Sequence, residues 1–236
     1  GYRPHDALAF TVLSGNMRYG KADASHLANL ARAEKADAVA LQELTPQAVQ
    51  RLVAAGLQRD YPYSQVAAGP DATGVGLWSK RPMTDKETYD GFTFHQVSAR
   101  IAFDASDPTR TLTLCSTHVV APWPGPAGRW VHELSRIAVI LGSQTGVSID
   151  AGDFNSTLDV AQFRDLLKKT DYADAAKQSG AGIVRTFPAD TAFPPLLGID
   201  HVLSRGAVAT GVRTVALPGS DHRGIVVRLL LPTQTL

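Results

Sequence analysis

Residues 147–155, with the sequence VSIDAGDFN, contain the pattern that decides the fold. The apolar run 147–151 predicts a buried strand. The tetrapeptide GDFN then places Asp153 and Asn155 directly after it. Loops at strand ends are where a rigid scaffold presents functional side chains. Taken alone, GDFN also fits a simple Asx-type turn, so its meaning depends on the rest of the chain.

The same arrangement recurs along the sequence. Apolar or alternating runs predict further strands at residues 8–13, 37–42, 75–79, 97–103, 111–117, 199–204, 212–217 and 224–231. Polar side chains stand at or just after the ends of several runs: Asn16, Glu43, His118, Asp153 with Asn155, Asp200 with His201, and Asp221 with His222. We expect these side chains to converge at one end of the fold.

Helical spacing of apolar residues predicts helices at residues 25–34, 45–55, 129–143 and 160–169. Thr45 and Pro46 have the N-cap and first-turn chemistry of a helix start. Because the strands come in adjacent runs with helices between the groups, an α/β sandwich is favoured over an alternating βαβ fold. The hydrophobic content of 44% supplies one sizeable core, and a single domain over residues 1–236 is expected.

Composition limits the partners. Lys and Arg total 23 against 22 Asp and Glu, a formal net charge of +1, so overall charge does not indicate a polyanion partner. Any phosphate site must therefore be local. Cys115 is the only cysteine, which excludes an internal disulfide and a multi-cysteine zinc site, and it is expected to pack in a strand. No run of the sequence is long enough for a transmembrane segment.

The strand-end side chains suit phosphoester chemistry. Hydrolysis of a phosphodiester or pyrophosphate needs a metal to neutralise phosphoryl oxygens, a group that orients or deprotonates water, and donors for the developing negative charge. Carboxylates, amides and histidines can supply all three.

The ordered fragments LSGN (13–16), LQE (41–43), STH (116–118), GDFN (152–155), IDH (199–201) and GSDH (219–222) resemble the endonuclease/exonuclease/phosphatase superfamily, whose members are DNase I-like. The resemblance implies a four-layer sandwich of two packed mixed β-sheets flanked by helices. It also implies a divalent-metal-dependent phosphoester hydrolase that attacks a phosphodiester, phosphomonoester or pyrophosphate by metal-assisted water attack.

The resemblance also implies roles for these residues. Glu43 corresponds to the principal Mg²⁺ ligand, with Asn16 and Asp221 nearby in the metal shell, and Mn²⁺ is an alternative ion. Asp153 and Asn155 would orient water and hold a phosphate oxygen, and His118 would donate a hydrogen bond to the phosphoryl group. His222, paired with Asp200, corresponds to the acid/base histidine.

Two departures and several structural alternatives accompany this assignment. Arg18 stands where some repair nucleases carry an aspartate, and no second glutamate can be matched to the one that assists histidine in DNase I. Asn16 is also typical of a strand-end turn, Glu43 of an exposed acid before a helix, and His118 of a hydrogen-bonded structural histidine. His201 is expected to be structural, because neighbouring strand residues point to opposite faces.

Two loops bear on the substrate. The segments VVAPWPGPAGRW (119–130) and FPADTAFPPLLG (187–198) are apolar, rich in proline and free of basic clusters. Exposure of their large apolar residues, Trp123, Phe193, Leu196 and Leu197, would favour a phospholipid or prenyl pyrophosphate. The alternative is that these side chains cover the core. A small or lipid-linked phosphorylated substrate is therefore favoured over the alternative of a metal-dependent DNA endonuclease. A second alternative is a catalytically inactive binding module of the same fold.

The chain also resembles bacterial family members that are membrane-anchored and face outside the cytoplasm. The resemblance implies an extracytoplasmic or secreted location, with an anchor or leader that this sequence, beginning GYRPHD, does not include. A monomer is expected.

Overall fold

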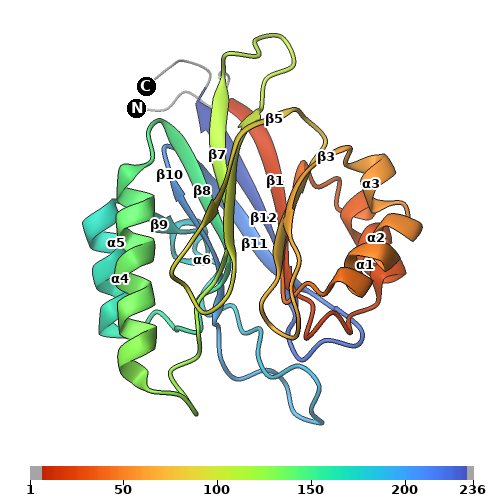
Figure 1. Cartoon of the computed structure of the whole chain (residues 1–236). Helices are drawn as coiled ribbons and strands as arrows, with labels where there is room; N and C mark the ends of the chain where they lie inside the picture. Colours follow the sequence, from red (N-terminus) through yellow and green to blue (C-terminus); the bar gives the residue numbers. More distant parts are fainter. Residues whose placement is uncertain (1–6, 233–236) are drawn as a thin grey trace.

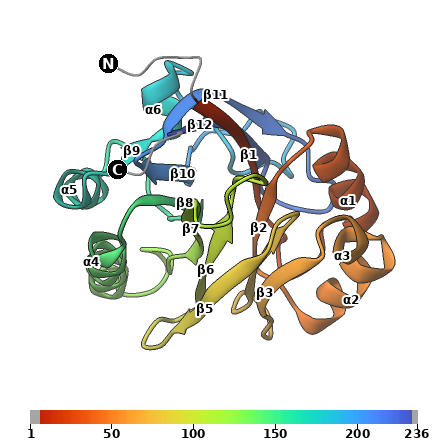
Figure 2. The same cartoon turned by 90° about the horizontal axis from the view of Figure 1, so that it is seen from above.

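Two six-stranded sheets pack face to face in the computed structural model, which describes residues 7–232 (Figure 1). Residues 1–6 and 233–236 lie outside the described residues. Both sheets are mixed, and helices cover their outer faces (Figure 2). The predicted four-layer α/β sandwich is confirmed.

The first sheet has the order β11-β12-β1-β2-β4-β3 and the second β5-β6-β7-β8-β10-β9. The first sheet contains β1 (Ala7–Asn16), β2 (Ala38–Gln42), β3 (Tyr63–Ala67), β4 (Val75–Ser79), β11 (Val208–Val215) and β12 (Gly224–Pro232). The second contains β5 (Met83–Tyr89), β6 (Gln96–Ala102), β7 (Thr111–His118), β8 (Val147–Asp153), β9 (Ala173–Asp174) and β10 (Asp200–Arg205).

Strand register brings the polar strand ends together. In the first sheet, β1 and β2 run parallel, with Asn16 opposite Gln42 and Glu43 next in the chain. In the second, β7 and β8 run parallel with His118 opposite Asp153, and β10 runs antiparallel to β8 with Asp200 opposite Asp153. Parallel strands end at the same edge of a sheet, so each sheet presents its polar residues at one end.

Three buried clusters hold the layers together. Val12, Leu114, Ile149 and Val227 belong to the large core between the sheets. A second cluster lies under α1 (Ala24–Ala33), α2 (Pro46–Ala54) and α3 (Leu57–Asp60), and a third under α4 (Ala127–Ser143) and α5 (Ala161–Thr170). The short helix α6 (Ala175–Ser179) lies beside β9 and β11 (Figure 2). Burying apolar surface on both faces of each sheet is the main stabilising contribution.

An N-cap hydrogen bond and a proline set the start of α2. The Thr45 hydroxyl accepts from the Ala48 N–H at 3.2 Å, and Pro46 takes the first helical position, so α2 begins as expected.

Cys115 is free and buried in β7, also as expected. Among residues 7–232, no helix is long and apolar enough to cross a membrane.

Several elements differ from the sequence prediction. Neither β3 nor β5 was predicted from the sequence. The exposed residues of β5 are mostly polar because this strand forms a sheet edge. β11 spans Val208–Val215, earlier than the predicted 212–217, and an irregularity between Ala209 and Gly211 interrupts its alternation. α3, α6 and β9 are too short to leave a periodic signal.

Asp150 is a buried acid in β8 that lies outside the polar cluster at the strand ends. The Thr117 hydroxyl donates to its Oδ1 at 2.6 Å, while Oδ2 has no partner within residues 7–232. Burial raises the pKa of Asp150 to about 7, although the Thr117 hydrogen bond opposes this shift. In the folded protein Asp150 therefore keeps its proton at pH values where the unfolded chain has lost it.

Asp150→Asn should remove part of the pH dependence of stability. Between about pH 4 and pH 7 the folded state binds more protons at this site than the unfolded state, so ionisation costs the wild type stability as pH rises. The unfolding free energy of the variant should gain on the wild type by about 4 kcal/mol over that window. Urea unfolding at pH 4.5, 6 and 8 measures the difference, and parallel curves for the two proteins would contradict it.

Candidate active site

The carboxylate of Asp153 is the centre of the polar cluster between the two sheets. The Asn16 amide donates to Asp153 Oδ2 at 3.1 Å and to Glu43 Oε1 at 3.0 Å. His118 Nε2 lies 3.6 Å from Asp153 Oδ2, and His222 Nε2 lies 3.7 Å from the same oxygen. Side chains from β1, the β2 end, β7, β8 and the loop before β12 therefore meet around one buried carboxylate.

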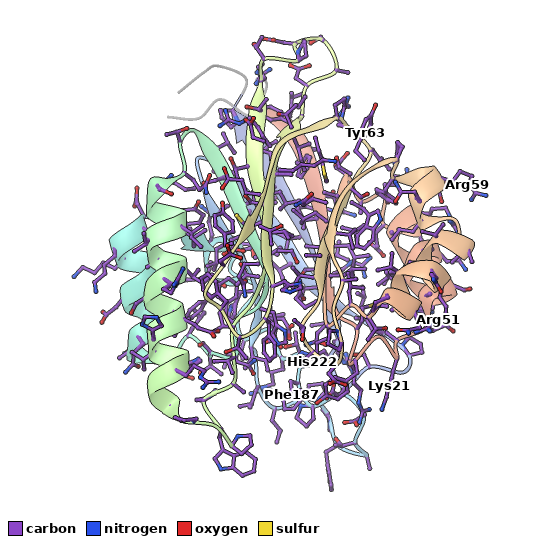
Figure 3. All side chains as sticks on the ribbon, viewed as in Figure 1. Lys21, Arg51, Arg59, Tyr63, Phe187 and His222 are labelled. Atoms are coloured by element: carbon purple, nitrogen blue, oxygen red, sulfur yellow. The ribbon has the colours of Figure 1, made fainter. Side chains whose placement is uncertain are left out.

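His222 and Asp200 form a dyad on one side of Asp153. His222 Nδ1 lies 2.8 Å from Asp200 Oδ2, and because a carboxylate only accepts, the ring nitrogen donates. The Phe187 ring packs against His222 with centroids 4.9 Å apart. Figure 3 shows His222 and Phe187 together at one end of the sandwich, on the side of Lys21 and opposite Tyr63. The family resemblance implied this His222–Asp200 pair.

The surroundings of His222 favour its charged form. Burial opposes its protonation, but the carboxylates of Asp200 and Asp153 outweigh burial and raise its pKa to about 10. The same burial, with the neighbouring charge of Asp200, raises the pKa of Asp153. His222 is therefore suited to donating a proton or hydrogen bond, and Asp153 to accepting one.

Glu43 closes β2 in a left-handed backbone conformation, with φ of 54°. The Tyr19 N–H donates to its Oε2 at 2.7 Å, and the Asn16 amide holds Oε1. Burial raises the pKa of Glu43, and the charge of Asp221 adds to that shift. A non-glycine residue held at positive φ is strained, so the surrounding contacts fix where this carboxylate points.

His118 is held between an aromatic ring and a carbonyl. Its ring stacks on Phe94 with centroids 4.2 Å apart, and Nδ1 lies 3.3 Å from the Ala72 carbonyl oxygen. That contact places a hydrogen on Nδ1, so Nε2 can donate only when the ring is doubly protonated. Burial lowers the pKa of His118, whereas the charge of Asp153 raises it. A phosphoryl anion bound beside Nε2 would favour the protonated ring.

Asp221, Arg18 and Asn155 lie at the edge of the cluster. Arg18 bridges two loops, with Nη1 2.9 Å from Asp190 Oδ2 and Nε 3.9 Å from Asp221 Oδ2. The Asn155 amide donates to the Val119 carbonyl at 2.8 Å. All eight predicted site residues thus lie in or beside one cluster, and the roles assigned to them stay predictions.

His201 holds the residue that follows the GDFN motif, Ser156. Its Nδ1 lies 2.8 Å from Asp174 Oδ2 and its Nε2 lies 2.7 Å from the Ser156 carbonyl. Because both partners only accept, both ring nitrogens carry hydrogen and the ring is charged. Its side chain points away from the cluster, as strand alternation predicts.

Glu133 of α4 was not identified from the sequence. It is 2% exposed, and its Oε1 accepts from the Thr93 N–H at 2.8 Å and the Thr93 hydroxyl at 2.6 Å. Its Oε2 accepts from the Val120 N–H at 3.0 Å. The available signal was an acid within the apolar stripe that contains Trp130, Leu134 and Ile137. Glu133 therefore connects two loops, the one that carries Thr93 and Phe94 and the one that follows His118.

The family model described as Endonuclease/Exonuclease/phosphatase family matches residues 13–222. The chain belongs to this family. Membership supports hydrolysis of phosphoesters in general, with a divalent metal, as the activity of this endonuclease/exonuclease/phosphatase protein. A comparison with curated proteins finds no match.

Solved structures confirm the DNase I-like fold of this endonuclease/exonuclease/phosphatase protein. A Bacteroides thetaiotaomicron family protein aligns with a TM-score of 0.76 at 15% identity, covering 98% of this chain and 97% of its own. A Bacteroides vulgatus family protein aligns at 0.74 and 18%, covering 95% and 99%. D. rerio TDP2, complexed with a single-strand DNA product, aligns at 0.75 and 17%, covering 94% and 98%.

The oxygen donors at the site fit a divalent cation. Ligand atoms of Asp153, Asp200 and His222 lie within 4.8 Å of one another, a spacing that can hold a metal. His222 Nδ1 is bonded to Asp200, however, and the neighbouring carboxylates raise the pKa of the ring, which disfavours metal binding through Nε2. Glu43 and Asp153 supply carboxylate oxygens instead, which are donors that Mg²⁺ prefers, while the Asn16 oxygen accepts from the Arg18 N–H at 2.8 Å. A cation beside Glu43 and Asp153 would also offset the cost of burying their charges.

Glu133→Gln should destabilise the protein by about 1–3 kcal/mol, because the new amide would face the Val120 N–H and leave a buried donor unsatisfied. The loop that carries Phe94 and the loop that follows His118 should both shift in this variant. Urea unfolding measures the stability, and NMR of the His118 ring reports its stacking on Phe94. Glu87→Gln, an exposed change on β5, is the charge-matched control. Unchanged stability and an unchanged His118 signal would contradict the anchoring role.

Proposed function

We propose that the protein is a Mg²⁺-dependent phosphoester hydrolase, with Mn²⁺ as an alternative ion, that acts on a small or lipid-linked substrate. The bond attacked is a phosphodiester, phosphomonoester or pyrophosphate. The observation that carries the proposal is the convergence of Asn16, Glu43, His118 and His222 on the buried Asp153 carboxylate. A carboxylate that accepts and an imidazolium that donates face the same small volume.

The proposed chemistry divides among these side chains. Glu43, with Asp221 nearby, would hold the cation, which would neutralise phosphoryl oxygens and polarise the phosphorus centre. Asn16 would join them as a ligand once its amide turns so that the oxygen, now bonded to the Arg18 N–H, faces Glu43. Asp153, with its raised pKa, would accept the proton of the attacking water, and Asn155 would help to hold a phosphate oxygen. His222 would donate from Nε2 to the developing negative charge while Asp200 fixes its ring. His118 would add a second donor.

The loops beside the site support a substrate with an apolar part. Trp123 is 81% exposed and Phe193 is 77% exposed, so these side chains do not cover the core. Leu196 and Leu197 are exposed as well. Exposed large apolar side chains next to a polar site are typical of a surface that contacts apolar ligands or lipids. A phospholipid or prenyl pyrophosphate suits this combination.

The second candidate is a metal-dependent DNA endonuclease. The D. rerio TDP2 structure favours it, because that protein of the same fold is complexed with a single-strand DNA product. The near-neutral net charge of +1 disfavours it, since phosphate backbone contacts usually need several Lys or Arg. A binding module without catalysis is the third candidate.

Glu43→Gln and Asp153→Asn should each reduce turnover by roughly 10²-fold or more, because each removes a group that acts on the transition state. The assay follows bis(4-nitrophenyl) phosphate hydrolysis with Mg²⁺, while circular dichroism confirms folding. Glu87→Gln should retain activity. Chelator should abolish wild-type turnover, and added Mg²⁺ or Mn²⁺ should restore it. Near-normal rates in both site variants would overturn the assigned roles, and a wild type without turnover would favour the binding module.

The substrate proposal is tested by a competition between substrate classes at near-physiological salt. Phosphate release from a prenyl pyrophosphate or phospholipid should exceed plasmid nicking. Trp123→Ser with Phe193→Ser should raise KM for the lipid substrate by roughly tenfold, the effect of losing burial of about two methylene groups, and spare bis(4-nitrophenyl) phosphate. Val139→Ser, an exposed change on α4, is the control. Efficient nicking that weakens steeply with salt, without lipid turnover, would establish the nuclease instead.

A further inference from the structure

A cavity of about 330 Å³ lies next to the candidate active site, on the side of β10 and α6. Residues 182–185 and 196–198 form its outer wall, and Val202, Val212 and Ile225 form its inner wall. Its volume is at the lower end of the range for ligand pockets, ~300–1,000 Å³. The cavity thus lies where β10 of one sheet approaches β11 and β12 of the other.

We propose that this cavity is a substrate subsite that binds an uncharged, mostly apolar group attached to the phosphoryl group. The inference rests on the proposed function, because it assigns the phosphoryl group to the space between Asp153 and His222. It adds a binding site separate from the exposed Trp123 and Phe193 side chains.

Asp200 joins the cavity to the catalytic cluster. It lines the cavity, and its Oδ2 accepts the hydrogen bond from His222 Nδ1. His201, the next residue, also lines the cavity, while its ring nitrogens are already engaged by Asp174 and Ser156. A group bound in the cavity would therefore contact the residue that holds the His222 ring.

The lining determines the chemistry of the occupant. Val184, Leu197, Val202, Val212 and Ile225 present hydrocarbon. The acid Asp159 and the base Arg185 are exposed, so charge of both signs stands toward solvent. Inside, Asp174 and His201 are bonded to each other, and Asp200 Oδ1 is an acceptor without a partner among the described residues. An anion carried inside would therefore lose water and meet a carboxylate, which is costly. An uncharged, apolar group is the occupant that the cavity favours.

The mouth has an apolar rim. Ile183 is 75% exposed and Leu196 is 68% exposed, and both line the cavity. Exposed branched side chains at a cavity mouth gain from covering a bound hydrocarbon group. The chain segment that carries Leu196 pairs with Phe187, which packs on His222. One loop thus contacts both the cavity, through Leu196, and the His222 ring, through Phe187.

The test uses two chromogenic substrates with the same leaving group, methyl 4-nitrophenyl phosphate and octyl 4-nitrophenyl phosphate. Wild type should show the lower KM for the octyl ester. Val212→Trp, which fills the cavity, and Leu196→Ser, which removes its rim, should each raise the octyl KM about tenfold. Both should leave methyl ester kinetics within about twofold. Thr210→Trp adds the same bulk at an exposed position of β11 and should change neither.

A binding arm without phosphate separates the subsite from catalysis. In methyl-labelled wild type, 1-octanol should shift NMR signals of Val184, Val202 and Ile225, and Val212→Trp should abolish these shifts. Equal octyl and methyl KM values in wild type, or no shifts from 1-octanol while methyl ester is hydrolysed normally, would overturn the subsite alone. Failure of wild type to hydrolyse either ester would overturn the proposed function and the subsite with it.

Discussion

A carboxylate buried between two sheets is the constraint on which the rest of the site depends. Asp153 is 2% exposed, and an isolated buried charge would be strongly destabilising. The fold surrounds it with an amide from Asn16 and imidazoles from His118 and His222. Each partner comes from a different strand or loop, so both sheets must pair in register before the charge is compensated. The same requirement that stabilises the fold therefore assembles the chemistry.

The features that could be predicted are those that depend on short stretches of sequence. GDFN follows an apolar strand, and strand pairing then places Asp153 opposite His118 and Asp200, so motif order and strand ends were enough to predict the cluster. Contacts made across the fold left weaker signals. Glu133 looks like an ordinary helix acid until its three hydrogen bonds to the Thr93 and Val120 loops are known. β5 was missed because an exposed edge strand selects polar side chains rather than alternation.

The buried cluster and the loops proposed to contact the substrate are separate parts of this molecule. The strand ends are buried and fixed by several contacts each, as at Glu43, where strain in the backbone is held by the Asn16 and Tyr19 hydrogen bonds. The loops that carry Trp123 and Phe193 are exposed. Arg18 links the two regions, since its ion pair with Asp190 ties the Asn16 turn to the loop before β10. A change in those loops can alter the substrate and leave the buried cluster intact.

Charge at the site explains why the substrate cannot be attracted by the protein alone. The acids Glu43, Asp153, Asp200 and Asp221 face the imidazolium of His222 and the guanidinium of Arg18, so negative charge is in excess before any phosphate arrives. A phosphoester adds more negative charge, and the net charge of +1 gives no broad field to draw it in. A divalent cation must therefore reverse the local sign. In the proposed function the remaining affinity would come from contacts away from the phosphate, for which the exposed Trp123 and Phe193 offer apolar side chains.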